Sequence, residues 1–180
     1  MPDSQSESRT TRIAGAGDVH AIVALVQSAY RGAASRASWT TEADLLDGQR
    51  TDADAVAALI HAPASRILLC EQNGVLLASA HIEKHGKTCH FGMFAVRPER
   101  QGGGLGRAML AEAERMARAE WSCLEMQMTV ITLRTELIVW YERRGYRRTG
   151  VFQPFPYGDV RFGLPKREDL RLEVLRKTLP

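Results

Sequence analysis

The stretch VRPERQGGGLGRAML, residues 96–110, places four glycines within six positions, after a predicted strand and before a predicted helix. Backbone amides at such a junction point at one spot, and the positive end of the helix dipole lies behind them. Glycine lets an anion approach these amides closely and permits positive φ angles. Arg97, Arg100 and Arg107 add positive charge around the run. The stretch therefore predicts a phosphate-binding cradle.

Two familiar phosphate-binding designs fit this run poorly. A Walker-type loop needs Lys-Ser or Lys-Thr after its last glycine, whereas Arg107 and Ala108 follow Gly106 here. A dinucleotide fingerprint normally follows the first strand of a parallel sheet, whereas an antiparallel meander is predicted before this run. The sequence therefore disfavours hydrolysis of nucleoside triphosphates and binding of a dinucleotide.

The periodicity of apolar residues divides the chain into helices and strands. Helices are predicted at residues 18–30, 40–49, 51–62, 105–119 and 135–146, with caps at Asp18, Thr41 and Thr51 and a left-handed end at Gly145. Strands are predicted at residues 66–71, 75–83, 88–96, 123–131, 146–152 and 170–177. An Asn-Gly turn joins the first two strands, and the helix at 105–119 forms a right-handed βαβ unit. The fold class is therefore α/β, or more narrowly an α+β fold with a mixed sheet.

Length and composition indicate one globular domain. The chain has 180 residues, of which 44% are hydrophobic and 25% charged. We expect residues 1–11 to form a disordered leader and residues 12–180 to form the domain. No apolar run reaches the roughly 20 residues of a membrane span. A net charge of +3, spread along the chain, does not imply nucleic acid as a partner.

The three cysteines and the histidines give no sign of a disulfide or metal site. The cysteines lie in apolar runs, which is typical of reduced core thiols in a cytoplasmic protein. His81, His85, Cys89 and His90 surround one predicted turn without the spacing of metal ligands. We therefore expect no metal.

The run from Gln101 to Gly106, Gln-Gly-Gly-Gly-Leu-Gly, resembles the Gln/Arg-x-x-Gly-x-Gly/Ala signature of the GNAT superfamily of N-acetyltransferases. The preceding FAVRPERQ and the later WYERRGY, residues 140–146, also resemble the family's patterns, and the order of elements is similar from about residue 12 to residue 179. The resemblance implies a mostly antiparallel twisted sheet whose one parallel pair splays apart at the coenzyme site, with helices on both sides. It also implies acetyl transfer from acetyl-coenzyme A to an amine by direct attack in a ternary complex.

In this family the donor lies along the end of the strand before the signature. The resemblance implies that the main chain of Phe94, Ala95 and Val96 meets the pantetheine and that the pyrophosphate meets the amides of Gln101, Gly102, Gly103, Gly104, Leu105, Gly106 and Arg107. The family commonly has an asparagine seven residues before its tyrosine, and Arg134 stands there in this chain. We group Arg134 with the coenzyme residues. It could instead pair with Glu136 or Glu142, or remain solvated.

Acetyl transfer needs an unprotonated amine, a stabilised oxyanion and a proton for the leaving thiolate. Tyr141 matches the family's acid, although packing alone would also explain an aromatic residue there. The amide of Val96 is the expected oxyanion donor. His90 is a possible base, with a structural histidine and a chain of waters as alternatives.

The acceptor should lie between two irregular segments that carry aromatic residues. Tyr30, Arg31 and Trp39 lie in one segment and Phe155 lies in the other, so we expect a half-closed pocket for a small-molecule or peptide amine. The same aromatics could cap the core or a subunit interface, and a homodimer is common in the family. A coenzyme A-binding sensor or interaction module without catalysis is the alternative function. O-transfer and a longer acyl donor also remain open.

Overall fold

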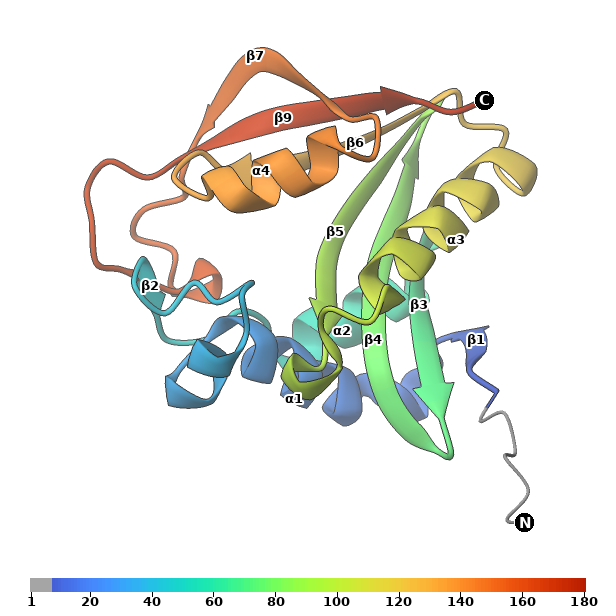
Figure 1. Ribbon diagram of the computed structural model, residues 1–180, viewed down its shortest axis with the longest axis horizontal. Helices are drawn as coiled ribbons and strands as arrows, with labels where there is room; N and C mark the ends of the chain where they lie inside the picture. The colour runs from blue at the N-terminus through green and yellow to red at the C-terminus, as the bar shows by residue number, and fades with distance from the viewer. Residues whose placement is uncertain (1–7) are drawn as a thin grey trace.

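The computed structural model describes residues 8–180, so most of the leader expected at residues 1–11 lies outside the described residues. A seven-stranded sheet of order β1-β3-β4-β5-β6-β9-β7 forms the centre of the molecule (Figure 1). Its strands are β1 (Thr10–Ile13), β3 (Ser65–Gln72), β4 (Val75–His85), β5 (Thr88–Val96), β6 (Glu125–Ile131), β7 (Arg147–Pro154) and β9 (Arg171–Thr178).

The sheet contains one parallel pair, β5 and β6, and this pair is splayed. The two strands are in register only at Thr88, Cys89 and His90 of β5, whereas β5 continues to Val96 and β6 to Ile131. Figure 1 shows them leaving a common end and diverging. The predicted mixed sheet and its splayed pair are therefore confirmed, and the splay leaves a wedge between the two strands.

Helices cover both faces of the sheet. Helix α1 (Val19–Tyr30) and helix α2 (Ala53–His61) share one buried cluster with Ile67 and Leu69 of β3. Helix α3 (Leu105–Ala119) and helix α4 (Thr135–Glu142) share the other cluster with Leu68. This alternation along β3 is the period of two expected of a strand that is buried on both faces. No helix in residues 8–180 is both long and apolar enough to cross a membrane.

Near the N-terminus the structure differs from the prediction at the start of the domain and at the cap of α1. Strand β1 was not predicted, and its first two residues, Thr10 and Thr11, pair with Glu71 and Cys70 although they were assigned to the leader. The predicted cap residues also differ. The Asp18 carboxylate accepts from Gly15 N and from the Arg12 guanidinium rather than capping α1.

The helix predicted at residues 40–49 is wrong. The segment forms turns and a short strand, β2 (Leu46–Asp47), which pairs with β8 (Leu164–Pro165). Leu46 is buried against Phe155 and Leu170, so contacts with the distant loop at residues 155–170 outweigh the local helical pattern. At α2 the cap is Asp52, which accepts from Ala55 N, rather than Thr51.

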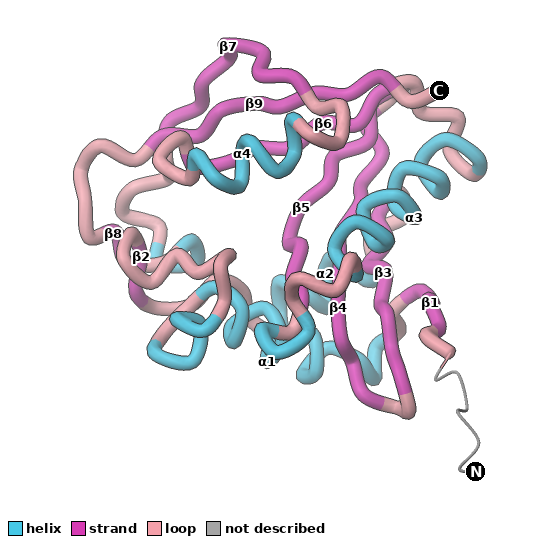
Figure 2. The backbone as a smooth tube through the Cα atoms, in the orientation of Figure 1, coloured by secondary structure: helices cyan, strands magenta, loops and turns pink. Residues whose placement is uncertain are grey.

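Other elements agree more closely with the prediction. Helix α4 ends at Glu142 rather than at residue 146, and Gly145 follows it at the predicted positive φ, +92°. The short 3-10 helices are η1 (Ala16–Asp18), η2 (Ala33–Ala37), η3 (Pro98–Arg100) and η4 (Val160–Phe162). Segments 31–52 and 155–170 meet at the left of Figure 2, where β2 and β8 lie side by side.

Candidate active site

The splay of β5 and β6 opens onto two cavities that meet. The larger one, of about 570 Å³, lies at the glycine run and is called the glycine-side cavity here. The smaller one, of about 200 Å³, lies beneath the loop at residues 155–170 and is called the arginine-side cavity. The residues that line both are Tyr30, Phe94, Leu137 and Tyr141. A reaction between ligands held in the two cavities would therefore occur beside these four side chains.

The glycine run shapes the first wall of the glycine-side cavity. Gly102 and Gly104 have φ angles of +85° and +78°, and a Cβ added at either would meet nothing within 4 Å. Gly104 is also the N-cap of α3, and no side chain caps the amides that begin this helix. This geometry suits an anion, as the glycine pattern suggests.

Gln101 fastens this run to the segment after α1. Its Nε2 donates to Val96 O at 3.0 Å and to Ser38 Oγ at 2.7 Å, while its Oε1 accepts from Trp39 N at 3.2 Å. One amide side chain therefore holds the end of β5, the start of the glycine run and residues 38–39 together.

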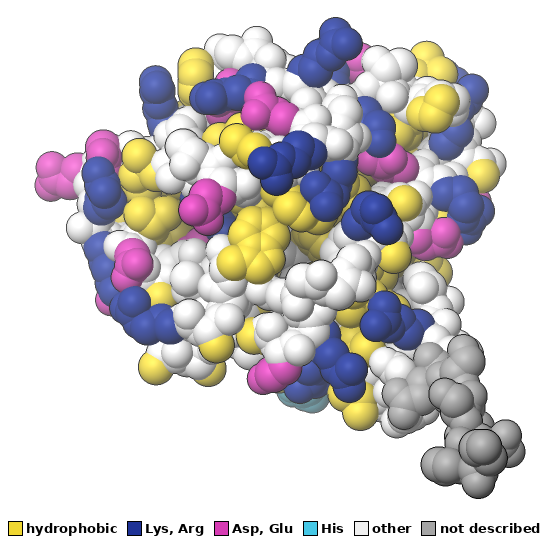
Figure 3. Space-filling view, in the orientation of Figure 1, with side chains coloured by type: hydrophobic (Ala, Val, Ile, Leu, Met, Phe, Trp, Pro, Cys, Tyr) yellow, Lys and Arg dark blue, Asp and Glu magenta, His cyan; other side chains and the backbone are white. Residues whose placement is uncertain are grey.

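Positive charge surrounds the same cavity. Arg107, Arg143 and Arg144 line it, and the Arg144 guanidinium lies 3.5 Å from the ring centre of Trp140. In Figure 3 basic side chains gather around a hydrophobic patch between α4 and the start of α3. An elongated ligand with an apolar part and several phosphates suits this surface.

The end of β5 turns main-chain groups into the wedge. Arg97 N donates to Leu77 O of β4, so in an antiparallel ladder the groups of Val96 and Phe94 point away from β4. The Phe94 carbonyl accepts from the Tyr30 hydroxyl, and the Val96 carbonyl accepts from Gln101. The N–H groups of these two residues face the side on which pairing with β6 has already ended.

Tyr141 differs from the chain's other three tyrosines in what its hydroxyl contacts. The hydroxyls of Tyr30, Tyr146 and Tyr157 donate to Phe94 O, Glu114 Oε1 and Arg167 O. The Tyr141 hydroxyl makes no hydrogen bond within residues 8–180, although its side chain lies at the join of the cavities and is only 5% exposed. Burial, and then proximity to Tyr30, raises the pKa of Tyr141 well above its usual value, so this phenol keeps its proton at neutral pH.

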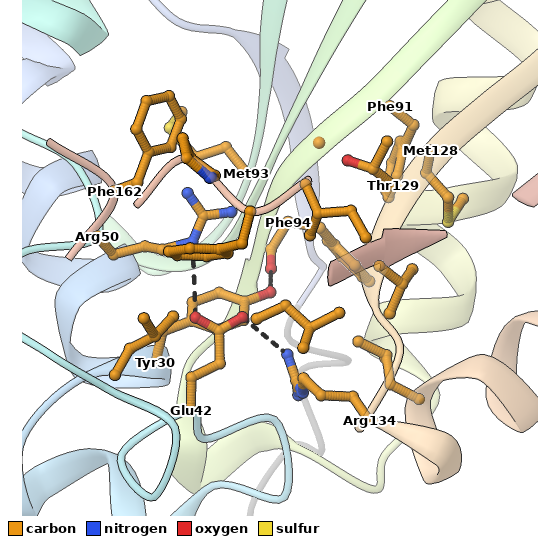
Figure 4. A pocket seen from close by; sticks show the side chains of 18 of the residues that line it. Tyr30, Glu42, Arg50, Phe91, Met93, Phe94, Met128, Thr129, Arg134 and Phe162 are labelled. Atoms are coloured by element: carbon orange, nitrogen blue, oxygen red, sulfur yellow. Dashed lines mark hydrogen bonds and ion pairs between the residues drawn. The ribbon is translucent and has the colours of Figure 1, made fainter. Parts of the chain in front are cut away.

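The arginine-side cavity is built around one buried carboxylate. Glu42 forms an ion pair with Arg31 and accepts from Arg134 Nη1 at 3.1 Å, while Arg50 Nε lies 3.9 Å from its other oxygen (Figure 4). Arg134 also donates to Thr40 O at 2.6 Å. Burial alone would raise the pKa of Glu42, but the three guanidiniums outweigh burial and hold it below its usual value. Glu42 is therefore ionised at neutral pH.

Apolar side chains form the rest of this cavity. They come from β5, β6, α4 and the late loop, and include Phe91, Met128, Leu137 and Phe155. The late loop is tied down over the cavity, because Lys166 Nζ donates to Ala43 O at 2.7 Å and Arg31 donates to Phe162 O at 3.4 Å. The cavity thus combines a cationic side with an apolar wall beneath a fastened loop.

Most residues predicted for the coenzyme lie at the glycine-side cavity. Phe94, Val96, Gln101, Gly102, Gly104, Gly106 and Arg107 line it, whereas Ala95 and Leu105 are buried outside it and Gly103 does not line it. Arg134, which was also predicted for the coenzyme, lines the arginine-side cavity and not the glycine-side one. It stands at the start of α4, where the buried Glu42 attracts its guanidinium.

The residues predicted for the acceptor divide between the cavities. Arg31 and Phe155 line the arginine-side cavity, and Tyr30 lines both. Trp39 lies instead at the glycine-side cavity, with its ring centre 6.2 Å from that of Trp140.

His90 lies away from both cavities. Its Nε2 is 3.2 Å from Gln127 Nε2, and its ring lies against that of His85 with centres 4.3 Å apart. Burial, and then the charge of His85, lowers the pKa of His90. His90 lines neither cavity, whereas Tyr141 lines both. Within residues 8–180 no group of three or more His, Cys, Asp or Glu side chains is placed to hold a metal ion.

Four charged residues that line the cavities were not predicted as site residues, namely Glu42, Arg50, Arg143 and Arg144. The two arginines directly after Tyr141 could have been found, because consecutive cations beside a predicted phosphate cradle are a local signal. Glu42 and Arg50 carry no such signal. They reach the cavity through contacts between distant parts of the chain, because Glu42 accepts from Arg134, 92 positions away, and Arg50 lies 3.9 Å from Glu42.

The fold and the two joined cavities suit a transferase that holds two ligands side by side. Over residues 21–146 the chain matches the acetyltransferase (GNAT) family, and it belongs to that family. The protein is therefore an acyltransferase of the acetyltransferase type.

Solved structures share this fold. The ribosomal-protein-S18-alanine N-acetyltransferase of Escherichia coli is 16% identical, with a TM-score of 0.71 over 96% of this chain and 94% of that one. The yncA protein of Salmonella typhimurium, solved with its cofactor acetyl-CoA, is 21% identical, with a TM-score of 0.69 over 96% and 95%. Mutant forms of the spermidine/spermine N-acetyltransferase SpeG from Vibrio cholerae are 16% identical, with a TM-score of 0.65 over 96% and 95%. A search of curated proteins finds no match.

Proposed function

We propose that the protein transfers an acetyl group from acetyl-coenzyme A in the glycine-side cavity directly to a small-molecule amine in the arginine-side cavity. The observation that carries this proposal is the uncommitted Tyr141 hydroxyl at the join of the cavities. Supporting a small acceptor, the arginine-side cavity measures about 200 Å³ and lies beneath a fastened loop. The homodimer and the cytoplasmic location remain predictions.

The chain's own groups fit the donor. Bound acetyl-coenzyme A supplies a thioester as the electrophile. The N–H groups of Phe94 and Val96 face the wedge and suit the amide carbonyls of an extended pantetheine, which would lie beside β5 like a further strand. The amides that follow Gly102 suit the pyrophosphate, and Arg143 and Arg144 add charge for phosphate.

Tyr141 is the proposed general acid, and Val96 N–H the proposed oxyanion donor. A phenol that keeps its proton and has no other partner can donate to a departing thiolate. A backbone amide at the open edge of β5 can donate to the carbonyl oxygen as its charge grows. Neither role requires a change in the fold.

Water is the proposed acceptor of the amine's proton, because His90 lines neither cavity. The charge of the arginine-side cavity also favours loss of this proton, because its lining carries three guanidiniums and one carboxylate. Excess positive charge disfavours an ammonium ion and so lowers the pKa of a bound amine. The free amine that attack requires is thereby favoured without a dedicated base.

Release of the coenzyme A thiol in the presence of primary amines tests the proposal. Tyr141→Phe should lower kcat by about 10²-fold or more, because it removes the acid, while the KM for acetyl-coenzyme A stays close to the original value. Unchanged turnover in this variant would contradict the role of Tyr141.

Tyr146→Phe is the matched control. Tyr146 packs edge-on against Tyr141 with ring centres 5.7 Å apart, but its hydroxyl is bound to Glu114 and it lines neither cavity. We expect its turnover to match that of the parent protein. Tight binding of acetyl-coenzyme A without thiol release to any amine would instead favour a sensor or interaction module.

A further inference from the structure

The charges that line the arginine-side cavity do not balance. Arg31, Arg50 and Arg134 are its three cations and Glu42 its one anion, so three positive charges less one negative charge leave two in excess. We propose that the acceptor amine also carries an acid group, a carboxylate or another oxyanion, and that the Arg50 guanidinium binds this group. The inference rests on the proposed function and names the class of its substrate.

Arg50 is the arginine of this cavity whose guanidinium N–H groups are free to bind a ligand. Arg31 and Arg134 are almost fully buried, with side chains 1% and 8% exposed, and each donates to Glu42 and to a backbone carbonyl. Arg50 is 32% exposed in its side chain, and its guanidinium makes no hydrogen bond within residues 8–180. Its nearest anion is the Glu42 oxygen at 3.9 Å, which is beyond hydrogen-bond length. Figure 4 shows it beside Glu42 at the pocket.

Arg31 provides a second, independent sign. Its Nε is buried and has no hydrogen-bond partner, although the residue is only 3% exposed and lines the same cavity. A buried donor without a partner is costly, because it has lost its hydrogen bonds to water without replacing them. This unpaired donor, together with the unbonded Arg50 guanidinium, shows that the cavity lining has more guanidinium donors than acceptors.

The surroundings restrict the rest of the acceptor. Arg50 lies over the Tyr30 ring at 5.5 Å, while the hydroxyl at the other end of this ring contacts the Phe94 carbonyl at the wedge. An acid group at Arg50 and an amine at the wedge would therefore both lie along the Tyr30 side chain. Phe91 and Met128 supply an apolar wall. A compact amino acid with an apolar side chain meets these requirements, whereas a polyamine adds cations to a lining that already has two positive charges in excess.

The test compares acids with their neutral amides as acceptors. The probes are alanine, valine, leucine and phenylalanine, each with its carboxamide, and 1-aminoethylphosphonate to distinguish a phosphonate from a carboxylate. The amides are the less basic amines, so a larger fraction of each is unprotonated at a given pH. We expect at least one acid to exceed its amide in kcat/KM by 10-fold or more. Arg50→Gln should reduce this ratio by about 10- to 100-fold, because a charged hydrogen bond is lost.

Arg115→Gln is the control, since Arg115 pairs with Glu112 on the surface of α3 and lines neither cavity. Its acid-to-amide ratio should match that of the parent protein. Amides or diamines used as well as the acids would overturn the inference while the proposed function stands. If no amine releases thiol, the proposed function fails, and thermal unfolding decides the inference. A rise in Tm with the acids that Arg50→Gln abolishes supports it, and no rise overturns it.

Discussion

Glu42 is the shared counter-ion of the three arginines in the arginine-side cavity. It is 7% exposed and contacts Arg31, Arg50 and Arg134, so its removal leaves three guanidiniums without a common counter-ion. Glu42→Gln should lower the free energy of unfolding by about 3–5 kcal/mol, the usual cost of breaking a buried pair. Urea unfolding at neutral pH measures this change.

The pH dependence of that loss gives a second measurement. The folded-state pKa of Glu42 lies below its usual value, so its contribution to stability is complete above the unfolded-state pKa and is lost as pH falls through the folded-state pKa. The difference between parent and Glu42→Gln should therefore shrink at acid pH. Asp44→Asn, at an exposed pair with Arg36, should change stability by less than about 1 kcal/mol at any pH. Equal losses in both variants would contradict the central role of Glu42.

Residues could be predicted from the sequence where a local motif or element carries them. Tyr141 and Gln101 each lie in a short sequence motif that predicts a place at the site, and both line the glycine-side cavity. Arg134 and Glu42 could not be paired in this way, because their contact spans 92 positions and depends on how the β6–α4 turn meets the loop after α1. The acceptor chemistry therefore lies in contacts that the sequence does not display.

At the scale of elements, the start of α3 depends on one backbone conformation. Gly104 is the N-cap at φ +78°, a region that costs a residue with a Cβ about 1–2 kcal/mol. Gly104→Ala should lower stability by about that amount and raise the KM for acetyl-coenzyme A several-fold, because the amides of the cradle shift. Chemical unfolding and initial rates at varied donor concentration measure the two effects.

The neighbouring glycine provides the control. Gly103 has no positive φ, and a Cβ there would meet only Arg100 O at 3.9 Å, an ordinary contact. Gly103→Ala should therefore leave stability near its original value. A larger loss of stability at Gly103 than at Gly104 would contradict this account of the start of α3.

Elements were predictable where their own pattern agrees with their surroundings. Strand β5 and helix α3 have the bounds that the sequence predicts, 88–96 and 105–119. The helix predicted at residues 40–49 does not form, because Leu46 packs against Phe155 and Leu170, which are more than 100 positions away in the chain. Strand β1 was missed because its side chains are exposed on both faces, which leaves no periodic signal.

At the scale of the whole molecule, the two cavities share a wall, so donor and acceptor should be present together. Tyr30, Phe94, Leu137 and Tyr141 line both cavities, and no thiol does. The three cysteines, Cys70, Cys89 and Cys123, are buried, and burial raises the pKa of each thiol. A thiol that does not ionise is a poor nucleophile. An acetyl-enzyme on cysteine is therefore disfavoured.

Initial-rate kinetics and mass spectrometry test this conclusion. Double-reciprocal plots at several acceptor concentrations should intersect, as expected of a ternary complex, and protein incubated with acetyl-coenzyme A alone should carry no acetyl group on cysteine. Protein unfolded in urea and treated with the same donor is the control, since its exposed thiols regain ordinary reactivity. Parallel plots with an acetylated cysteine would contradict direct transfer. Such a result would require the wedge to open far enough to expose a thiol that the structure buries in its core.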